Sequence, residues 1–552
     1  MKQWTTKRQK MGMLLSILLA TSLAAGCSNN QGGNEPQAST GSTDGNETQV
    51  DNKTEEVGFP DQLKYWVPLG TASSTKSSLS EVGVYQKLQE LTGTKVEFTH
   101  PSEDGNQQTE QLNIMIASGN LPDVVETNWL NVPRGPQNAI DEGTIIRLNE
   151  LIEEYAPNLR KYLDENPEME NLIKTDEGSI YAFPFLRGDK ILTVFYGPTI
   201  RKDWLDKLNL EVPTTIEEWE NTFIAFRDQD PNGNGEKDEI PFTLRLSEVR
   251  SEGTNALIGA WGIASRFYQV DGEVRYGEIQ PEYKEFLTTM QRWYEEGLID
   301  PDFAANDSKL IDARMTGNQL GALYAYNGGG IGKYTGLMTE TNPDFNLVGI
   351  LNPTLNKGDT PALGQMDKIF NGTGAAISGN AKNPEAIVKW LDQGYSEEGH
   401  MLFNFGIEGE SYEMVDGYPT FTDQITKNAD GLPMAQALAE YARSISYGPF
   451  VQDRRYIEQY YNLDAQSEAL ETWSQAKNEI QMPPVTLTAE ESQKFGNIMN
   501  DVNTYAEEMI TKFIMGAEKI EKFDDFVANL KKFKIEEAIA IQQAALDRYN
   551  NR

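Results

Sequence analysis

Leu63-Lys64-Tyr65-Trp66-Val67 begins an alternation of strand and helix patterns that decides the fold class. A helical pattern follows from Glu81 to Leu91 (EVGVYQKLQEL), and a second strand is expected at Lys95 to Phe98. The same order repeats, with a helix from Gln108 to Ser118 and a strand that begins at Pro122-Asp123-Val124-Val125. Strands that alternate with helices predict an α/β fold.

Residues 1–26 are typical of a bacterial export signal. Their positively charged start is followed by an apolar run, Met11 to Leu23, that is short for a membrane span. Small residues then precede Cys27, the only cysteine of the 552-residue chain. This order predicts that Cys27 is lipidated and anchors the protein at the extracellular face of the cell membrane. A buried apolar cysteine is the alternative.

Residues 27–59 are rich in Asn, Gly, Ser, Thr and Glu, which predicts a flexible tether before the folded part. The formal net charge is −36, and it is about −40 without the signal, whose charged residues are all basic. Nucleic acid and anionic membrane surfaces are therefore poor partners. The length of the chain predicts more than one lobe.

The stretch Asp228 to Phe242 (DQDPNGNGEKDEIPF) has oxygen-bearing side chains at alternate positions of a glycine-rich turn. Ca²⁺ needs about six to eight oxygens, and alternate side chains of a tight loop can converge on one ion. Pro241 stands where an EF-hand has its bidentate glutamate, so a helix-loop-helix calcium sensor is not expected. A solvated turn is the alternative to a metal loop. The expected calcium ligands are Asp230, Asn232, Asn234, the carbonyl of Glu236, Asp238 and Glu239.

Two capping boxes, at Thr215 and at Thr488, mark the starts of two further helices. Thr215 and Glu218 stand three residues apart and open a helix that leads into the proposed metal loop. Thr488 and Glu491 open a longer helix that is expected to run to Gly516. The C-terminal part is therefore expected to be mainly helical.

Several kinds of catalytic chemistry lack the residues they need. His100 and His400 are the only histidines and stand in no nucleophile motif, while Cys27 belongs to the expected anchor. A zinc site is disfavoured for the same reason, and there is no Walker loop or dinucleotide fingerprint. A glycosidase needs only two carboxylates, so this activity stays open.

Short motifs occur in a characteristic order along the chain. They are Met115–Val124 (MIASGNLPDV), Ile200–Leu208 (IRKDWLDKL), the loop Asp230–Pro241, Trp293–Pro301 (WYEEGLIDP), Gly406–Gly409 (GIEG) and Ile541–Ala544 (IQQA). In this order they resemble family 1 of the extracellular solute-binding lipoproteins of ABC importers, especially the oligosaccharide-binding members of Gram-positive bacteria. The resemblance covers nearly the whole chain after the signal.

The resemblance implies a two-lobed, periplasmic-binding-protein-like (type II) α/β fold with a hinge between discontinuous lobes. The first lobe would comprise 60–187 and 369–435, and the second 188–368, with the metal loop, and the helical part 436–552. The chain would cross between lobes near Phe185 to Asp189 and near Asp367 to Phe370. The family also implies a monomer without enzymatic activity, with a structural Ca²⁺.

A sugar presents apolar CH faces and hydroxyl groups, so its site needs aromatic rings and planar hydrogen-bonding groups. Each candidate could instead be an ordinary core or surface residue. The candidates are aromatic residues that do not fall on the apolar face of an expected helix, polar residues near them, and Arg187 on the expected hinge. They are Trp66, Asn128, Trp129, Arg187, Tyr196, Trp261, Tyr324, Tyr326, Glu408 and Tyr412.

The expected function is capture of an oligosaccharide in a cleft between the lobes and its delivery to the permease of an ABC importer. A receptor for peptides or other solutes is the nearest alternative. A surface-anchored glycoside hydrolase or lyase, and an adhesion or regulatory lipoprotein without transport, are alternatives from other classes.

Overall fold

The computed structural model describes residues 57–251 and 255–552. The expected signal 1–26, Cys27 and most of the expected tether 27–59 lie outside the described residues. Within the described ranges, no helix is long and apolar enough to cross a membrane.

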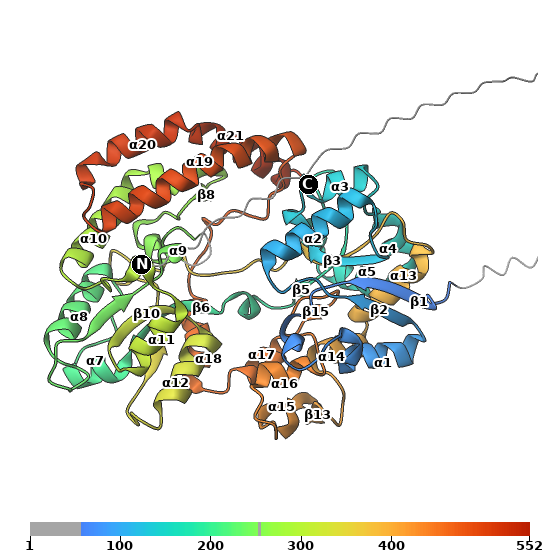
Figure 1. Ribbon diagram of the computed structural model, residues 1–552, viewed down its shortest axis with the longest axis horizontal. Helices are drawn as coiled ribbons and strands as arrows, with labels where there is room; N and C mark the ends of the chain where they lie inside the picture. Colours follow the sequence, from blue (N-terminus) through green and yellow to red (C-terminus); the bar gives the residue numbers. More distant parts are fainter. Residues whose placement is uncertain (1–56, 252–254) are drawn as a thin grey trace, which may run out of the picture. The chain divides into compact units, whose positions relative to one another are not determined.

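The first lobe is built on a five-stranded sheet with the order β2-β1-β3-β12-β4 (Figure 1). β1 is parallel to β2 and β3, whereas β12 is antiparallel to β3 and β4. The expected strand-helix alternation is confirmed, because α1 and α2 join these parallel strands. The elements are β1 (Gln62–Trp66), α1 (Gly83–Thr92), β2 (Lys95–Thr99), α2 (Gly105–Ser118), β3 (Val124–Asn128), β4 (Phe183–Pro184) and β12 (Thr373–Ile377).

The core of the first lobe lies between this sheet and its helices. It contains Leu63 and Tyr65 of β1, Val124 and Val125 of β3, and also Phe450 from much later in the chain. The helical run of this lobe is interrupted before Pro157, because α4 ends at Tyr155 and α5 begins with the proline. The remaining helices are α3 (Gly135–Asp141), α4 (Asn149–Tyr155), α5 (Pro157–Glu165), α6 (Pro167–Leu172) and α13 (Pro384–Asp392).

The second lobe is built on a four-stranded sheet with the order β11-β6-β10-β7. β6 is antiparallel to β10 and β11, and β10 is parallel to β7. A two-stranded hairpin, β8 and β9, belongs to the same core. The strands are β6 (Tyr196–Arg201), β7 (Ile240–Thr243), β8 (Phe267–Val270), β9 (Glu273–Tyr276), β10 (Leu320–Tyr326) and β11 (Leu347–Gly349).

Helices cover the second sheet, and the C-terminal helices add a layer of their own (red in Figure 1). The capping box at Thr488 and Glu491 is present, and α19 follows it for 26 residues. Thr215 caps α8 as predicted, but Glu218 turns to Thr214 instead of completing the box. The helices are α7 (Lys202–Leu208), α8 (Ile216–Asp228), α9 (Leu246–Val249), α10 (Pro281–Glu295), α11 (Ser308–Thr316), α12 (Lys333–Met338), α19 (Ala489–Ile514), α20 (Phe523–Lys532) and α21 (Ile535–Asn550).

Residues between 397 and 473 form a smaller group with a hydrophobic cluster around Phe405, Tyr412 and Ile457. Its short strand β15 pairs in parallel with β5, which follows β4 of the first lobe. Its last helix, α18, contacts β11 of the second lobe. The elements are β5 (Leu186–Arg187), α14 (Glu397–Phe405), β13 (Tyr412–Val415), β14 (Tyr418–Phe421), α15 (Asp423–Thr426), α16 (Met434–Ala439), β15 (Val451–Gln452), α17 (Arg454–Tyr460) and α18 (Asp464–Trp473).

Three stretches of chain pass between the two lobes: 185–195, 352–370 and 453–464, the last of which joins β15, paired with β5, to α18, which contacts β11. The first two lie side by side, since Arg187 N donates to Ile369 O at 3.1 Å. The third begins next to the first, because Gly188 N donates to Gln452 O at 3.0 Å. A Cβ at Gly188 would stand 2.7 Å from this carbonyl oxygen, so the close approach requires glycine.

The exact lobe boundaries stay a prediction. Ala439, Phe450 and Val451 pack in the core of the first lobe, which favours a later boundary than the expected one between 435 and 436.

Candidate binding site

Two adjacent cavities form the candidate binding site. The first has a volume of about 510 Å³ and lies in the first lobe against residues 443–447. The second has a volume of about 290 Å³ and lies beside Arg187 and Phe195 of the first connection. Ile445, Ser446 and Tyr447 line both cavities and form their common wall.

Side-chain amides and hydroxyls make up most of the polar lining of the first cavity. α2 contributes Gln108 and Asn113, and the end of β3 with the turn after it contributes Asn128 and Asn131. The amide of Asn128 is held in place, because its Oδ1 accepts from Leu130 N and its Nδ2 donates to Asn371 O, both at 3.0 Å. Neutral groups of this kind can donate to and accept from hydroxyl groups.

One buried ion pair stands in the wall of the first cavity. Arg443 Nη2 lies 2.8 Å from Glu126 Oε1, and the two side chains are 5% and 2% exposed. Tyr65 Oη donates to the other carboxylate oxygen at 2.7 Å, and Arg443 Nη1 donates to Tyr85 Oη at 3.0 Å. Burial raises the pKa of Glu126, and the adjacent Arg443 acts against this rise. Each charge is thus matched before any ligand arrives.

Aromatic rings line the second cavity. Tyr447 is 44% exposed, and its ring meets that of Phe185 edge-on at a centroid distance of 5.2 Å. Phe195, Tyr456 and Tyr461 complete the aromatic lining. An exposed tyrosine ring held by a second aromatic residue offers a flat face to the apolar side of a sugar.

Tyr326 extends this aromatic surface. It is 50% exposed, and its ring is stacked on Phe195 with a centroid distance of 6.0 Å and an interplanar angle of 6°. Tyr196 supports it edge-on at 4.9 Å. Tyr326 therefore lies next to the second cavity without being part of its lining.

The structure distributes the ten predicted ligand residues over several environments. Asn128 and Arg187 line the cavities, and Tyr326 lies beside them. The other seven line neither cavity. Glu408 is exposed, and the remaining six are buried: Trp66, Trp129, Tyr196, Trp261, Tyr324 and Tyr412. Their role as ligand contacts stays a prediction.

Arg187 is committed to the junction of the connections. Its Nη2 lies 2.6 Å from Asp367 Oδ2, and its Nη1 donates to Lys368 O at 2.8 Å. The guanidinium also lies over the ring of Phe185, at 5.7 Å from the centroid. Arg187 thus joins the first two connections through its side chain as well as its backbone.

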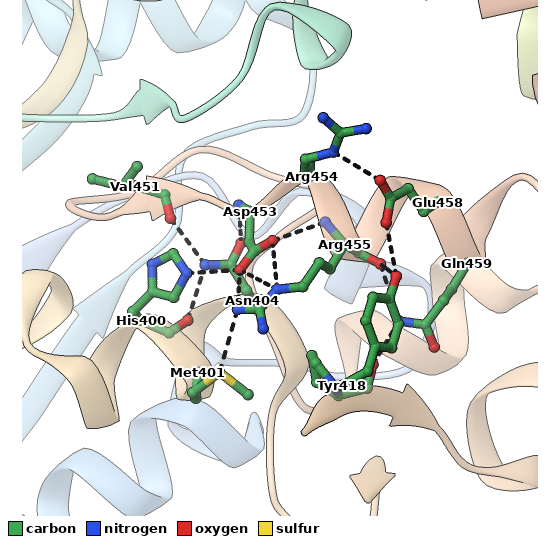
Figure 2. A network of polar contacts seen from close by, with 11 residues as sticks. His400, Met401, Asn404, Tyr418, Val451, Asp453, Arg454, Arg455, Glu458 and Gln459 are labelled. Atoms are coloured by element: carbon green, nitrogen blue, oxygen red, sulfur yellow. Dashed lines mark hydrogen bonds and ion pairs between the residues drawn. The ribbon is translucent and has the colours of Figure 1, made fainter. Parts of the chain in front are cut away.

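A polar network holds the start of the third connection (Figure 2). Asp453 accepts from His400 Nε2 at 2.9 Å and pairs with Arg455 at 2.5 Å, and it also caps α17. Asn404 donates to Val451 O and accepts from Asp453 N, at 2.9 and 2.8 Å. Burial alone would raise the pKa of Asp453, but the hydrogen bonds from His400 and Arg455 outweigh it and hold this pKa well below its usual value.

The loop between α8 and β7 is closed by its own polar groups. The carboxylate of Asp230 accepts from the backbone amides of Gly233, Asn234 and Gly235 at 2.8, 3.1 and 3.1 Å. Asn232 Nδ2 and Asn234 Nδ2 both lie 3.0 Å from Asp238 Oδ1. The alternate side chains therefore converge, and none of them lines either cavity.

Glu239 shows how a cation would fit this loop. Its Oε1 is buried and has no hydrogen-bond partner among the described residues. Burial raises the pKa of Glu239, and the nearby charges of Asp230 and Asp238 raise it further. No group of three or more His, Cys, Asp or Glu side chains in the described part of the chain is placed to hold a metal ion. The loop could therefore hold an ion only with help from amide and backbone oxygens, which suit Ca²⁺.

No motif in the sequence marks Arg443, Tyr447 or the amides of α2 as site residues. Tyr447 precedes Gly448-Pro449, so an aromatic residue beside a turn pair was the signal available for it. Arg443 is the only charged residue in YARSI (441–445), and a lone charge in a weakly polar stretch is a signal for a paired buried group.

Comparison with known proteins agrees with this architecture. Residues 72–401 match the family model described as bacterial extracellular solute-binding protein. A similar relative is the fructooligosaccharide ABC transporter substrate-binding protein FusA of Streptococcus pneumoniae. The two share 29% identity over 533 residues, which cover 90% of this chain and 93% of FusA.

Two solved structures share the fold over nearly their whole length. The alginate-binding protein AlgQ2, solved without calcium ion, is 26% identical with a TM-score of 0.69, and the match covers 89% of this chain and 98% of AlgQ2. An EF-hand mutant of S. pneumoniae FusA in complex with fructo-nystose is 25% identical with a TM-score of 0.67, and covers 89% and 99%. On the match to its family model, the chain belongs to the bacterial extracellular solute-binding proteins.

Proposed function

We propose that this protein captures an oligosaccharide in the two adjacent cavities and delivers it to the permease of an ABC importer. The observation that carries the proposal is the composition of the site: amides and hydroxyls in the first cavity and an exposed tyrosine face in the second. The similarity to FusA, a fructooligosaccharide ABC transporter substrate-binding protein, supports the same class of ligand.

The proposed contacts divide by chemistry. Gln108, Asn113 and Asn131 would exchange hydrogen bonds with sugar hydroxyls. Tyr447 and Tyr326 would stack on the apolar faces of the rings. Since both cavities lie next to the connections, bending at these connections would close the lobes on the ligand.

The number of carboxylates in the site does not favour a glycosidase. Glu126 is the only carboxylate that lines either cavity among the described residues, and it is paired with Arg443. Glycoside hydrolysis ordinarily uses two carboxylates, one as an acid and one as a base or nucleophile. A binding protein without turnover is therefore the function that the site favours.

Calorimetric titration of the purified protein with a panel of neutral and acidic oligosaccharides tests the function. We expect Tyr447→Ala to weaken binding of the preferred sugar at least tenfold, because it removes the exposed ring. Tyr447→Phe is the matched control and should stay within about threefold, because it keeps the ring. Tight binding of a peptide with no response to any sugar would refute the proposal.

We further propose that the loop between α8 and β7 holds a structural Ca²⁺. The proposed ligands are Asp230, Asn232, Asn234, the carbonyl of Glu236, Asp238 and Glu239. The bound ion would neutralise the loop carboxylates and stabilise the second lobe. Support comes from FusA, for which an EF-hand mutant is described, and from AlgQ2, which is described in a form without calcium ion.

Thermal unfolding with excess Ca²⁺ and with a chelator tests the calcium proposal. We expect a higher melting temperature with Ca²⁺, and no such difference for Asp238→Asn. Asp228→Asn is the matched control, because Asp228 pairs with Arg227 and is not a proposed ligand. Equal melting temperatures of the unchanged protein under both conditions would refute the site.

The anchor also remains a proposal. Lipidation at Cys27 after removal of residues 1–26 would hold the protein at the outer face of the membrane, near its permease. Residues 27–59 would then give the folded part its reach.

A further inference from the structure

We infer that the site selects neutral oligosaccharides and rejects those built from uronic acids. This inference rests on the proposed function, and it concerns the charge of the ligand. Recognition of an ionised carboxylate in a partly buried site ordinarily requires an unpaired cation, most often an arginine that can bind both oxygens. The cations of the site therefore decide the question.

Only two cationic side chains line the cavities in the part of the chain that the structure describes, Arg443 in the first and Arg187 in the second. Both terminal nitrogens of Arg443 are engaged, by Glu126 at 2.8 Å, by the hydroxyl of Tyr85 at 3.0 Å and by the carbonyl of Tyr447. Its Nε has no hydrogen-bond partner among the described residues, but this atom is buried. Because Glu126 is 2% exposed, the carboxylate cannot turn away into water to release the guanidinium.

Arg187 is also paired, but its partner Asp367 is 30% exposed, whereas Glu126 is 2% exposed. The side chain of Arg187 is 8% exposed, and it pairs with Asp367 at 2.6 Å while donating to Lys368 O at 2.8 Å. Breaking this pair would also loosen the junction between two connections. Both guanidinium groups thus have a carboxylate partner, Glu126 in the wall of the first cavity and Asp367 outside the lining of either cavity, so neither arginine brings an unpaired positive charge to the site.

A uronic acid would meet this site at a disadvantage. Its carboxylate is ionised at neutral pH, and it would lose water without gaining a cation. The strongly acidic chain, with a formal net charge of −36, adds a long-range repulsion. The hydroxyls of a neutral sugar, in contrast, would find the amides of Gln108, Asn113 and Asn131.

The shared fold does not decide the charge of the ligand. AlgQ2 is described as alginate-binding, and alginate is a polymer of uronic acids, yet its chain matches this one over most of its length. The difference that we infer therefore lies in the side chains of the cavities.

The test compares neutral trisaccharides, kestose and maltotriose, with trigalacturonate by calorimetric titration of the same protein. We expect at least one neutral sugar to bind more than tenfold more tightly than trigalacturonate. Trigalacturonate binding within tenfold of the best neutral sugar, or more tightly, would overturn the inference and leave the proposed function standing. Binding of none of the three would overturn the inference, whereas the proposed function falls only if no sugar of the wider panel binds.

Variants test the paired arginines as the cause. Glu126→Gln removes the carboxylate from Arg443, and Asp367→Asn does the same for Arg187. We expect at least one of these variants, shown to be folded by circular dichroism, to bind trigalacturonate at least tenfold more tightly than the unchanged protein. No gain in either folded variant would overturn the role of the pairs.

Glu170→Gln is the matched control for these variants. Glu170 pairs with Arg160 and Lys174 at 2.6 Å each, and it lines neither cavity. The affinity of the Glu170→Gln variant for trigalacturonate should equal that of the unchanged protein. An equal gain in this control would show that a less negative net charge alone explains the tighter binding of trigalacturonate, and would overturn the inference.

Discussion

Segment 443–455 is held by charged groups at both of its ends, and the two ends differ in their access to water. At one end Arg443 and Glu126 are almost completely buried, in the wall of the first cavity. At the other end Asp453 is buried, but its partners His400 and Arg455 are 30% and 32% exposed. The same kind of interaction therefore fixes the site wall rigidly at one end and the third connection more loosely at the other.

The comparison predicts the largest loss of stability for Arg443→Met. This change leaves the carboxylate of Glu126 buried without its cation, which costs about 3–5 kcal/mol of unfolding free energy. Denaturant titration measures the loss. The double variant with Glu126→Gln should recover much of the stability, because no uncompensated charge then remains. A loss below about 1 kcal/mol would show that this end is not the rigid one.

Asp453→Asn should cost less, about 1–2 kcal/mol, because it weakens the cap of α17 and the contacts with His400 and Arg455. The cost should depend on pH. The pKa of Asp453 is lower in the folded state than its usual value of about 3.9, so its contribution is full above that pH. It is lost as the pH falls towards the folded-state pKa.

Unfolding curves between pH 7 and pH 3 would measure this dependence. The difference between the unchanged protein and Asp453→Asn should be constant near neutrality and should shrink in acid. A difference that grows on acidification has the wrong sign and would contradict this reading of the network.

Arg454→Gln should have the smallest effect. Arg454 is 50% exposed and pairs with Asp189 at 3.1 Å and with Glu458 at 2.7 Å. Exposed pairs contribute about 0–1 kcal/mol, and salt screens them. A loss of unfolding free energy as large as that of Asp453→Asn would break the contrast between the two ends, since it would make the exposed pairs as important as the buried acid.

Local patterns were sufficient to predict much of the fold. The apolar residues of Leu63–Val67, the glycines after α1 and α2, and the box at Thr488 all act over a few residues, so the sequence displays them directly. The loop from Asp230 to Glu239 was found for the same reason, although its metal remains a proposal.

The candidate site was harder to predict, because exposure depends on distant pairing. Trp66 and Trp129 look like sugar-binding rings in the sequence, but both lie in the core of the first lobe. The ring of Tyr447 is held against Phe185, about 260 residues earlier in the chain, beside the pairing of β15 with β5. Likewise, nothing near Arg443 in the sequence indicates that Glu126 is its partner.

The three neighbouring connections restrict how the two lobes can turn against each other. A single connection would allow the lobes to rotate freely about it. Three connections joined at Arg187, Gly188 and Asp367 resist twisting of one lobe against the other, so bending is the motion that needs the least energy. Repeated opening would then bring the same faces back into register. An importer that recognises both lobes at once would therefore meet one reproducible closed shape. The angle between the two lobes would then be enough to distinguish a loaded receptor from an empty one.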